Sequence, residues 1–393
     1  RLADDIWGIG FKTADRIAAN MGFDSQSYER IRSGILYVLN QMSNEGHCFA
    51  YRDQLVEEAA KMLEAQPELI QKAVDKMVEE SSIIQDINDA VFLAAFYHSE
   101  AGVARRLKKI METDSQFIHN TVDNLVQYIE AINSIKYNDM QRKAIEKAGS
   151  CKLMVLTGGP GTGKTFTTLG ILSLFKLLKA RILLAAPTGR AAKRMSEVTG
   201  MEARTIHRLL EYKPARGYTY NEDNPLKCDV LILDEVSMVD LVLMYNLLKA
   251  VPDEAIVILV GDVDQLPSVG AGNVLRDIIN SDKVEVIRLT EIYRQAQGSM
   301  IITNAHRVNQ GKSPRYKGSK NRDFFFIEEE DPDNAARTII SLVTERIPKY
   351  YGLDPVRDIQ VLCPMLKGSA GAHNINQMLQ DKLTGRGESV KYG

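Results

Sequence analysis

The feature that most constrains this chain is the glycine-rich run at residues 158–165, which reads Gly-Gly-Pro-Gly-Thr-Gly-Lys-Thr. It follows the apolar residues 153–157, which are typical of a buried strand, and it precedes a stretch with helical periodicity. This spacing satisfies the GxxxxGK(S/T) pattern in the strand–loop–helix setting where that pattern cradles phosphate groups. A glycine-rich turn without a ligand is the alternative, and the agreement between residues and setting disfavours it.

Apolar segments alternate with helical segments around this loop, which predicts an α/β fold with a parallel sheet and helices on both faces. The expected strands are residues 153–157, 182–186, 230–233, 256–260 and 284–287. They define a P-loop domain over residues 134–290, in which an inserted hairpin at about 211–227 interrupts the alternation. A second, incomplete α/β domain is predicted over residues 291–393. Its strands are expected at 324–327 and 359–363, around a helix at 334–346.

The first 133 residues are predicted to be mainly helical. Apolar residues recur at three- and four-residue spacing in residues 54–63, 67–80 and 121–132. A short hairpin is expected from strands at 83–87 and 91–96, and helices followed by such a hairpin would form a winged-helix-like unit. We expect two domains here: a first domain over residues 1–45, and a helical, winged-helix-like domain over residues 46–133.

The composition is that of an ordinary globular chain, with 45% hydrophobic and 25% charged residues among 393. No apolar run approaches the roughly 20 residues that a membrane-spanning helix needs, so no membrane partner is expected. The net charge of −2 gives no sign of nucleic-acid binding, and any such surface must be a local patch. Four scattered cysteines argue against disulfides and zinc and favour a reducing, cytoplasmic setting. The chain begins with Arg1 rather than Met, which suggests a piece of a longer protein.

The residue types of the glycine-rich run suit the phosphates of a nucleotide. Glycines let backbone N–H groups curl around phosphate oxygens, and the following helix adds its dipole. Lys164 is expected to reach the β- and γ-phosphates of ATP, and Thr165 is expected to bind Mg²⁺. The residues predicted to surround the nucleotide are Gly158, Gly159, Pro160, Gly161, Thr162, Gly163, Lys164, Thr165 and Phe166.

Two carboxylates, Asp234 and Glu235, follow the expected strand at residues 230–233. Ligands bind at the carboxyl ends of the strands in an open parallel sheet, which places this pair near the phosphate loop. Asp234 is expected to hold Mg²⁺, and Glu235 is expected to orient and deprotonate the attacking water. A pair of acids that caps the next helix is the alternative, and the upstream phosphate loop weakens it.

Three further segments narrow the class of ATPase, at residues 137–141, 261–272 and 289–295. They resemble the Q-motif, motif III and motif IV of superfamily 1 helicases of the RecD-like (exodeoxyribonuclease V alpha subunit) family. The resemblance implies that Gln141 reads the adenine edge, that Gln265 hydrogen-bonds the γ-phosphate, and that Arg294 stabilises charge developing there. Taken alone, Gln141 equally suits a polar position behind a helix N-cap, and Arg294 equally suits a surface salt bridge.

Other segments resemble the family's contacts with DNA. Residues 186–195 resemble motif Ia, where a strand end and a helix start carry Thr188, Arg190 and Lys193. Residues 205–210 resemble motif Ic and contain His207. Residues 361–368 resemble a strand–loop–helix of the second motor domain, with Lys367 as a possible phosphate contact. A solvated helix start and an ordinary packing histidine are the alternatives for the first two.

Residues 4–18 resemble a helix-hairpin-helix, a module that RecD-like helicases carry before their motor. The resemblance implies that residues 1–45 form a helix-hairpin-helix DNA-binding region. Gly8 and Gly10 would let backbone N–H groups face a DNA phosphate, and Lys12 and Thr13 would add side-chain contacts. A helical turn whose glycines serve close packing is the alternative.

The resemblance covers essentially the whole chain and implies two RecA-like domains, the second incomplete, with ATP and Mg²⁺ between them. It further implies 5′-to-3′ movement on single-stranded DNA and action at single-strand/duplex junctions. Further family motifs would lie beyond residue 393, so the chain is expected to be truncated at both ends. The alternatives are an ATPase subunit of a RecBCD-type nuclease complex, a switch ATPase that does not travel, and a passive DNA-binding module. The sequence carries no signal for the oligomeric state or the pathway.

Overall fold

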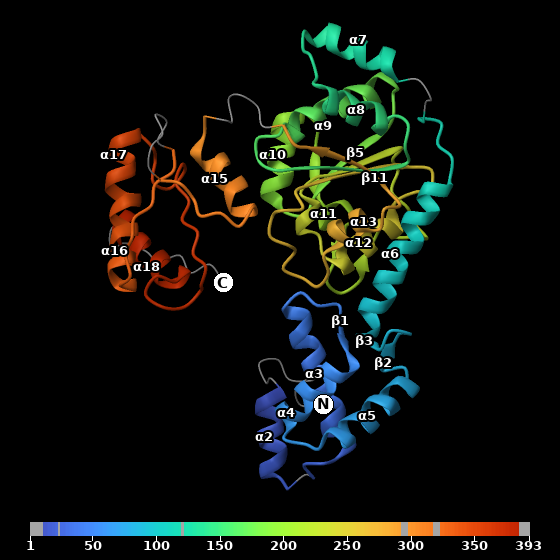
Figure 1. Cartoon of the computed structure of the whole chain (residues 1–393), viewed down its shortest axis with the longest axis vertical. Helices are drawn as coiled ribbons and strands as arrows, with labels where there is room; N and C mark the ends of the chain where they lie inside the picture. Colours follow the sequence, from blue (N-terminus) through green and yellow to red (C-terminus); the bar gives the residue numbers. More distant parts are fainter. Residues whose placement is uncertain (1–10, 23, 119–121, 292–297, 317–322, 385–393) are drawn as a thin grey trace. The chain divides into compact units, whose positions relative to one another are not determined.

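The computed structural model describes residues 11–22, 24–118, 122–291, 298–316 and 323–384 (Figure 1). The chain forms two compact units, Arg1–Pro314 and Arg315–Gly393. The expected boundary after residue 290 therefore falls within the first unit. Helix α15 (Met300–Asn309) belongs to that unit, and the side chain of its residue His306 contacts Pro160 in the glycine-rich loop.

The N-terminal part of the first unit has the element order of a winged helix. Its elements are α2 (Phe11–Asn20), α3 (Tyr28–Asn44), β1 (Phe49–Tyr51), α4 (Arg52–Leu63), α5 (Pro67–Glu79), β2 (Ile83–Gln85) and β3 (Ala90–Leu93). The strands form an antiparallel sheet in the order β1-β3-β2, in which β2 and β3 make the hairpin. Ile35 of α3, Leu55 of α4 and Ile70 of α5 share one core. Because α3 lies in that core, the expected boundary between residues 45 and 46 cuts through a single packed unit.

Local sequence signals account for the ends of these elements. Pro67 occupies the first turn of α5, where its missing N–H costs no helical hydrogen bond. In the hairpin turn, Asp86 Oδ1 accepts hydrogen bonds from the backbone N–H groups of Asn88 and Ala90, and Asp89 adopts a φ of 60°. Short polar side chains favour such turns because they hydrogen-bond to the nearby backbone.

A long helix, α6 (Ala94–Glu112), runs directly from β3 and packs against the larger sheet domain. A Cβ added at Gly102 would come within 2.1 Å of the Tyr245 ring, so glycine is required for this close approach. Arg106 Nη2 donates to the carbonyl of Val251 at 2.7 Å and forms an ion pair of 2.7 Å with Asp253. Helix α6 therefore links the winged-helix part to the sheet domain.

The sheet domain is built on a six-stranded sheet in the order β11-β4-β10-β9-β5-β6, and all its neighbouring strands are parallel. The strands are β4 (Leu153–Gly158), β5 (Ile182–Ala186), β6 (Ala203–Thr205), β9 (Val230–Leu233), β10 (Ile256–Gly261) and β11 (Glu285–Leu289). The five predicted strands are confirmed, with β11 shifted by one or two residues. The short edge strand β6 was not predicted, because it has only three residues and none of them is buried.

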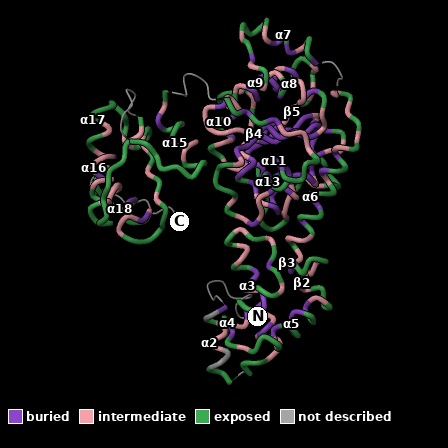
Figure 2. Tube along the Cα trace, in the orientation of Figure 1, coloured by how far each residue is buried: buried purple, intermediate pink, exposed green. Residues whose placement is uncertain are grey.

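Helices cover both faces of this sheet, as predicted, and buried residues concentrate in its strands (Figures 1 and 2). Alternate residues of β4 face opposite sides: Leu153 and Val155 join one core, and Met154 and Leu156 join the other. The helices are α7 (Asp123–Asn133), α8 (Asp139–Ala148), α9 (Lys164–Leu177), α10 (Gly189–Thr199), α11 (Ile206–Leu209), α12 (Leu241–Ala250) and α13 (Val274–Asn280). The sheet thus lies between two helical layers, and all its carboxyl ends meet at one edge.

The second unit, in its described residues, is helical. Its elements are α16 (Pro332–Ser341), a π-helical turn (Leu342–Arg346), α17 (Ile347–Tyr351) and α18 (Ala372–Leu383). The predicted helix is confirmed, but the strands expected at residues 324–327 and 359–363 are wrong. A strand needs a paired neighbour, and the described residues of this unit provide none. The apolar side chains that suggested strands are also exposed, with Phe325 at 61% and Leu362 at 84%.

Among the helices of the described residues, none combines the length and the apolar character that crossing a membrane requires.

Candidate nucleotide site and nucleic-acid interface

The glycine-rich loop joins the carboxyl end of β4 to the start of α9, as the sequence predicted. Gly161 and Gly163 have φ values of 76° and 86°, which side chains rarely tolerate. A Cβ added at Gly158 would come within 2.5 Å of the Leu289 carbonyl oxygen, which belongs to the neighbouring strand β11. The glycines therefore serve both the curvature of the loop and its close approach to the sheet.

Lys164 lies inside the curve of this loop. Its Nζ donates to the carbonyl oxygens of Gly158 and Gly159, the latter at 3.2 Å. It also lies 3.9 Å from Oδ2 of Asp262, a residue that is only 2% exposed at the end of β10. Sequence reasoning assigned no role to Asp262, although it lies within the segment that resembles motif III. Its burial and its place beside β4 add a third carboxylate to the site.

Asp234 and Glu235 follow β9, which is separated from the phosphate-loop strand only by β10. The backbone N–H of Asp234 donates to the carbonyl of Ala185, and its Oδ1 accepts from the N–H of Glu235 at 2.9 Å. Burial raises the pKa of Asp234. Burial, together with the neighbouring Asp234 charge, raises the pKa of Glu235. A carboxylate with a raised pKa is a stronger proton acceptor, which suits a general base.

The residues present fit a nucleotide with its magnesium ion. The hydroxyl of Thr165 and the carboxylate of Asp234 are hard oxygen donors, the type that Mg²⁺ prefers. Two buried hydroxyls at this end of the sheet, Thr157 Oγ1 and Ser237 Oγ, have no hydrogen-bond partner among the described residues. Buried polar groups normally have partners, so such orphaned atoms point to a polar ligand or solvent nearby.

Gln141 is fully buried at the start of α8. It forms a capping box with Asn138: the Gln141 N–H donates to Asn138 Oδ1 at 2.8 Å, and Gln141 Oε1 accepts from the Asn138 N–H at 3.2 Å. Gln141 therefore has the helix-capping role that the sequence analysis gave as the alternative to adenine binding. Its Nε2 has no hydrogen-bond partner among the described residues, which leaves a donor for an adenine edge. Phe166 packs against the ring of Tyr137, with centroids 5.1 Å apart.

The loop that resembles motif III is anchored at both ends. Asp262 accepts from the N–H of Asp264 at 3.1 Å, and the N–H of Gly272 donates to the Gly46 carbonyl at 3.0 Å. Between these ends, the side chain of Gln265 is exposed. Its predicted bond to the γ-phosphate remains a prediction. Arg294 lies outside the described residues.

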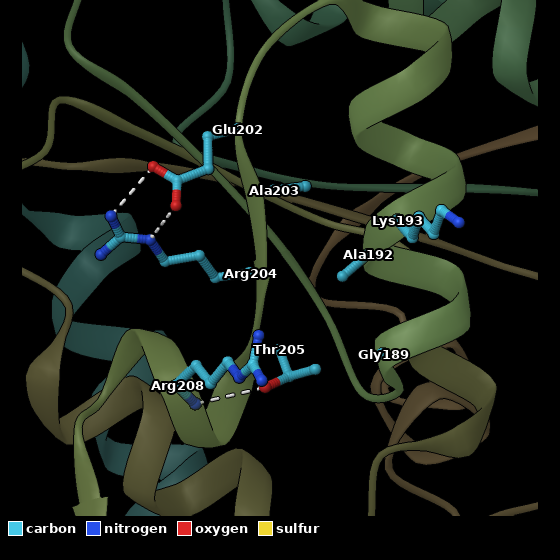
Figure 3. Close-up of a pocket in the computed structure, with 8 residues that line it drawn as sticks. All are labelled: Gly189, Ala192, Lys193, Glu202, Ala203, Arg204, Thr205 and Arg208. Carbon is cyan, nitrogen blue, oxygen red and sulfur yellow. Dashed lines mark hydrogen bonds and ion pairs between the residues drawn. The ribbon is translucent and has the colours of Figure 1, made fainter.

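Two of the predicted DNA-contacting segments, residues 186–195 and 205–210, contribute to one pocket. Figure 3 shows α10 on one side and the β6–α11 segment on the other. Thr188 caps α10, because its hydroxyl accepts from the Ala191 N–H at 3.2 Å. Arg190 and Lys193 are exposed on the same helix. The residues that line the pocket are Gly189, Ala192, Lys193, Glu202, Ala203, Arg204, Thr205 and Arg208.

Arg204 and Arg208 were missed by sequence reasoning, although Arg208 directly follows His207. The guanidinium of Arg204 forms a pair of hydrogen bonds with Glu202, at 2.8 and 2.9 Å. Within the described part of the chain, Arg208 has no ion-pair partner, so its charge is available to a phosphate. The extended segment after α10 that becomes β6 brings both arginines to this surface.

The predicted insertion at residues 211–227 begins as a hairpin, with strands β7 (Tyr212–Lys213) and β8 (Gly217–Tyr218). Its base holds an aromatic cluster in which the Tyr212 and Tyr218 rings lie 4.9 Å apart. His207 packs against both, at 5.7 and 6.1 Å. His207 therefore supports the hairpin from the motif Ic segment, and it remains exposed.

The other predicted DNA contacts are scattered. Lys367 is exposed in the second unit, and Thr13 is exposed on α2. Gly8 and Gly10 lie outside the described residues. The backbone of Lys12 belongs to α2, and its side chain lies outside the described part.

Comparisons with known proteins agree with this organisation. The model of an AAA domain matches residues 141–271, and the model of the ATP-dependent RecD2 DNA helicase HHH domain matches residues 1–49. The chain is 34% identical to the ATP-dependent RecD2 DNA helicase of Deinococcus radiodurans over 389 residues, which cover 96% of this chain and 52% of the relative. The chain is thus similar to a RecD-like helicase over nearly its whole length.

A second RecD-like relative is the RecBCD enzyme subunit RecD of Mycobacterium tuberculosis, which is 38% identical over 277 residues. They cover 62% of this chain and 48% of that subunit. The chain thus spans about half the length of these two curated relatives. Among solved structures, the Pif1 helicase from Candida albicans aligns with 53% of this chain and 55% of that chain, at 20% identity and a TM-score of 0.38.

Proposed function

We propose that the chain is the motor part of an ATP-dependent DNA helicase that hydrolyses ATP with Mg²⁺ and moves on single-stranded DNA. The observation that carries this proposal is the order of strand ends along one sheet edge. The phosphate loop follows β4, Asp262 follows β10, the acidic pair follows β9, and the basic pocket follows β5 and β6. Four strand spacings separate β4 from β6, which is roughly 20 Å along the edge.

Each residue of the phosphate site has a proposed task. Lys164 exchanges its bonds to the loop carbonyls for bonds to the β- and γ-phosphates. Thr165 and Asp234 would hold Mg²⁺, which when bound offsets negative charge on the phosphates. Glu235 accepts the proton of the attacking water, and Gln265 reports the γ-phosphate. Gln141 binds the adenine, and Arg294 stabilises the charge that develops on the transferred phosphoryl group.

The DNA path is proposed to follow the basic pocket. The side chains proposed to contact backbone phosphates, without reading sequence, are Thr188, Arg190, Lys193, His207 and Arg208. Such contacts are electrostatic and suit a motor that has to move along any sequence. Lys367 and the helix-hairpin-helix residues Gly8, Gly10, Lys12 and Thr13 are proposed as further contacts.

The proposal extends to 5′-to-3′ polarity, which the resemblance to the RecD-like family implies, to single-strand/duplex junctions as substrates and to a cytoplasmic location. The four cysteines are free thiols, which is consistent with a reducing compartment. The hairpin at β7 and β8 is proposed as the pin that separates strands. Its deletion from the intact enzyme is expected to abolish unwinding and to spare translocation, and equal loss of both would contradict that role.

The match of the helix-hairpin-helix model to residues 1–49 favours a stand-alone helicase over a subunit of a nuclease complex. Co-purification of the native protein with nuclease subunits would reverse this preference.

The test is ATP binding and hydrolysis by the chain, with and without single-stranded DNA, beside Lys164→Ala and Glu235→Gln. We expect DNA-stimulated turnover that both substitutions remove, with binding retained in Glu235→Gln. Absence of ATP binding by the folded parent chain would refute the proposal. ATP binding without any response to DNA would instead favour a switch ATPase.

A further inference from the structure

The side chain of His306 contacts the phosphate loop. This residue lies on α15, outside every segment to which the sequence assigned a role. Its Nε2 lies 3.3 Å from the carbonyl oxygen of Pro160. A carbonyl only accepts hydrogen bonds, so Nε2 carries a proton and donates. Its Cε1 lies 2.7 Å from the place that a Cβ of Gly159 would occupy.

The contact explains why a glycine stands at residue 159. Gly159 is absent from the residues with positive φ, so its backbone conformation does not require glycine. The space beside its Cα is filled by the imidazole ring instead. A side chain at this position would have to displace His306 from Pro160.

The carbonyls of three consecutive loop residues have side-chain donors. Lys164 donates hydrogen bonds to the carbonyls of Gly158 and Gly159, and His306 donates one to the carbonyl of Pro160. In the proposed function Lys164 leaves these carbonyls for the phosphates. Two side-chain donors then remain on this rim of the loop: Thr162 Oγ1, which donates to the Gly159 carbonyl at 2.8 Å, and His306, which donates to the Pro160 carbonyl.

The ring is placed by the packing of its helix. Ser299 caps α15 by accepting a hydrogen bond from the Ile302 N–H at 3.3 Å. Met300 and Asn304 are buried on the same helix, at 9% and 3% exposure. The half-buried His306 is therefore held at the loop by a helix with its own buried contacts.

We propose that His306 is a positioning residue of the nucleotide site, which holds the Gly159–Pro160 rim in the curvature that receives the phosphates. The inference rests on the proposed function, because it concerns the affinity of that same site for ATP. It assigns His306 no contact with the reacting atoms.

The first experiment compares His306→Ala, His306→Leu and His306→Gln with the parent chain. Leucine fills the space without a donor, and glutamine carries an amide donor at a similar reach. The dissociation constant of a fluorescent ATP analogue is measured, together with KM and kcat for ATP. We expect alanine and leucine to weaken binding and raise KM about five-fold, as the loss of one hydrogen bond predicts. We expect kcat to change less than two-fold, and glutamine to restore most of the affinity.

Val308→Ala is the matched control, since Val308 is exposed on the same helix. Thermal unfolding of every variant shows whether the fold is retained. Leucine as effective as glutamine would overturn the proposal, because packing alone would then suffice. A fall in kcat at unchanged KM would overturn it as well.

The second experiment is a double-mutant cycle with Gly159→Ala. A methyl group at residue 159 should dislodge the ring, so Gly159→Ala and His306→Ala break the same contact. The double variant is expected to bind ATP no more weakly than Gly159→Ala alone. Multiplication of the two separate effects would contradict the contact.

Lys164→Ala in the same titration separates this inference from the proposed function. If the parent binds no nucleotide, the proposed function fails. If the parent binds, Lys164→Ala does not, and the His306 variants all bind like the parent, only the present inference fails.

Discussion

The nucleotide site and the basic pocket occupy the same edge of one sheet, yet they are built in opposite ways. Asp262 and Thr162 of the nucleotide site are each 2% exposed; Asp262 directly follows β10, and Thr162 lies in the loop between β4 and α9. At the pocket, the side chain of Lys193 is 80% exposed and that of Arg204 is 50% exposed. Buried charges interact strongly because little water screens them, whereas exposed charges act weakly and additively. The first site suits chemistry, and the second suits a sliding grip.

The largest expected effect is the loss of ATP turnover when residues of the nucleotide site are replaced. Lys164→Ala and Glu235→Gln should each reduce kcat by about 10³-fold, because each removes a group that acts on the transferred phosphate or on its nucleophile. Lys176→Ala is the control, since Lys176 is exposed near the end of the same helix α9. Steady-state hydrolysis measures the effect. Residual turnover near the parent rate in Glu235→Gln would remove that residue from its proposed role.

A second difference lies in the pH dependence of hydrolysis. Burial raises the pKa of Glu235, so its carboxylate gains a proton at a higher pH than an exposed glutamate does. The value of kcat/KM for ATP should therefore fall toward acid pH, tenfold per pH unit below the raised pKa. A pH–rate profile measures this limb. A profile that is flat down to the ordinary range of an exposed glutamate would contradict the role of burial.

At the basic pocket, the affinity for single-stranded DNA should change only modestly when one positive charge is removed, and it should depend on the salt concentration. Arg208→Ala is expected to weaken single-stranded DNA binding about three- to ten-fold and to reduce the slope of log K against log salt by about 0.7. Fluorescence anisotropy at several salt concentrations measures both quantities. The control is Lys283→Ala, an exposed lysine in the loop before β11. An equal loss in both variants would show that general charge, and not this pocket, attracts the DNA.

The smallest expected effect is a gain in stability when the proposed general base, Glu235, is replaced. The folded-state pKa of Glu235 is raised, so ionisation of this carboxyl destabilises the fold progressively as the pH rises from the ordinary glutamate pKa, and the full penalty is present above the raised pKa. Glu235→Gln removes the charge and should raise the melting temperature by about 2 °C at pH 7.5. The gain should shrink as the pH falls and the native carboxyl becomes protonated. Thermal unfolding at a series of pH values tests this, and a gain that grows toward acid pH would refute it.

Prediction from sequence succeeded where the residues that make a site are neighbours along the chain. The phosphate loop, the acidic pair and the five long strands were found because local glycines, carboxylates and apolar runs define them. It failed at residues 324–327 and 359–363, where apolar runs suggested strands but neither pairs nor becomes buried in the described structure. Apolar character is a property of the segment, whereas strand pairing depends on a distant partner.

Sequence alone determined that this chain contains a glycine-rich loop with the phosphate-binding pattern in an α/β domain and that its motifs resemble those of RecD-like helicases. Tertiary structure decided which distant residues join those motifs. Parallel pairing of β10 with β4 brings Asp262 toward Lys164, and β6 brings Arg204 and Arg208 to the pocket. The packing of α15 places His306 on the loop, 146 residues away from Pro160. Such contacts depend on strand order and helix packing, which long-range burial sets and which local residue patterns do not encode.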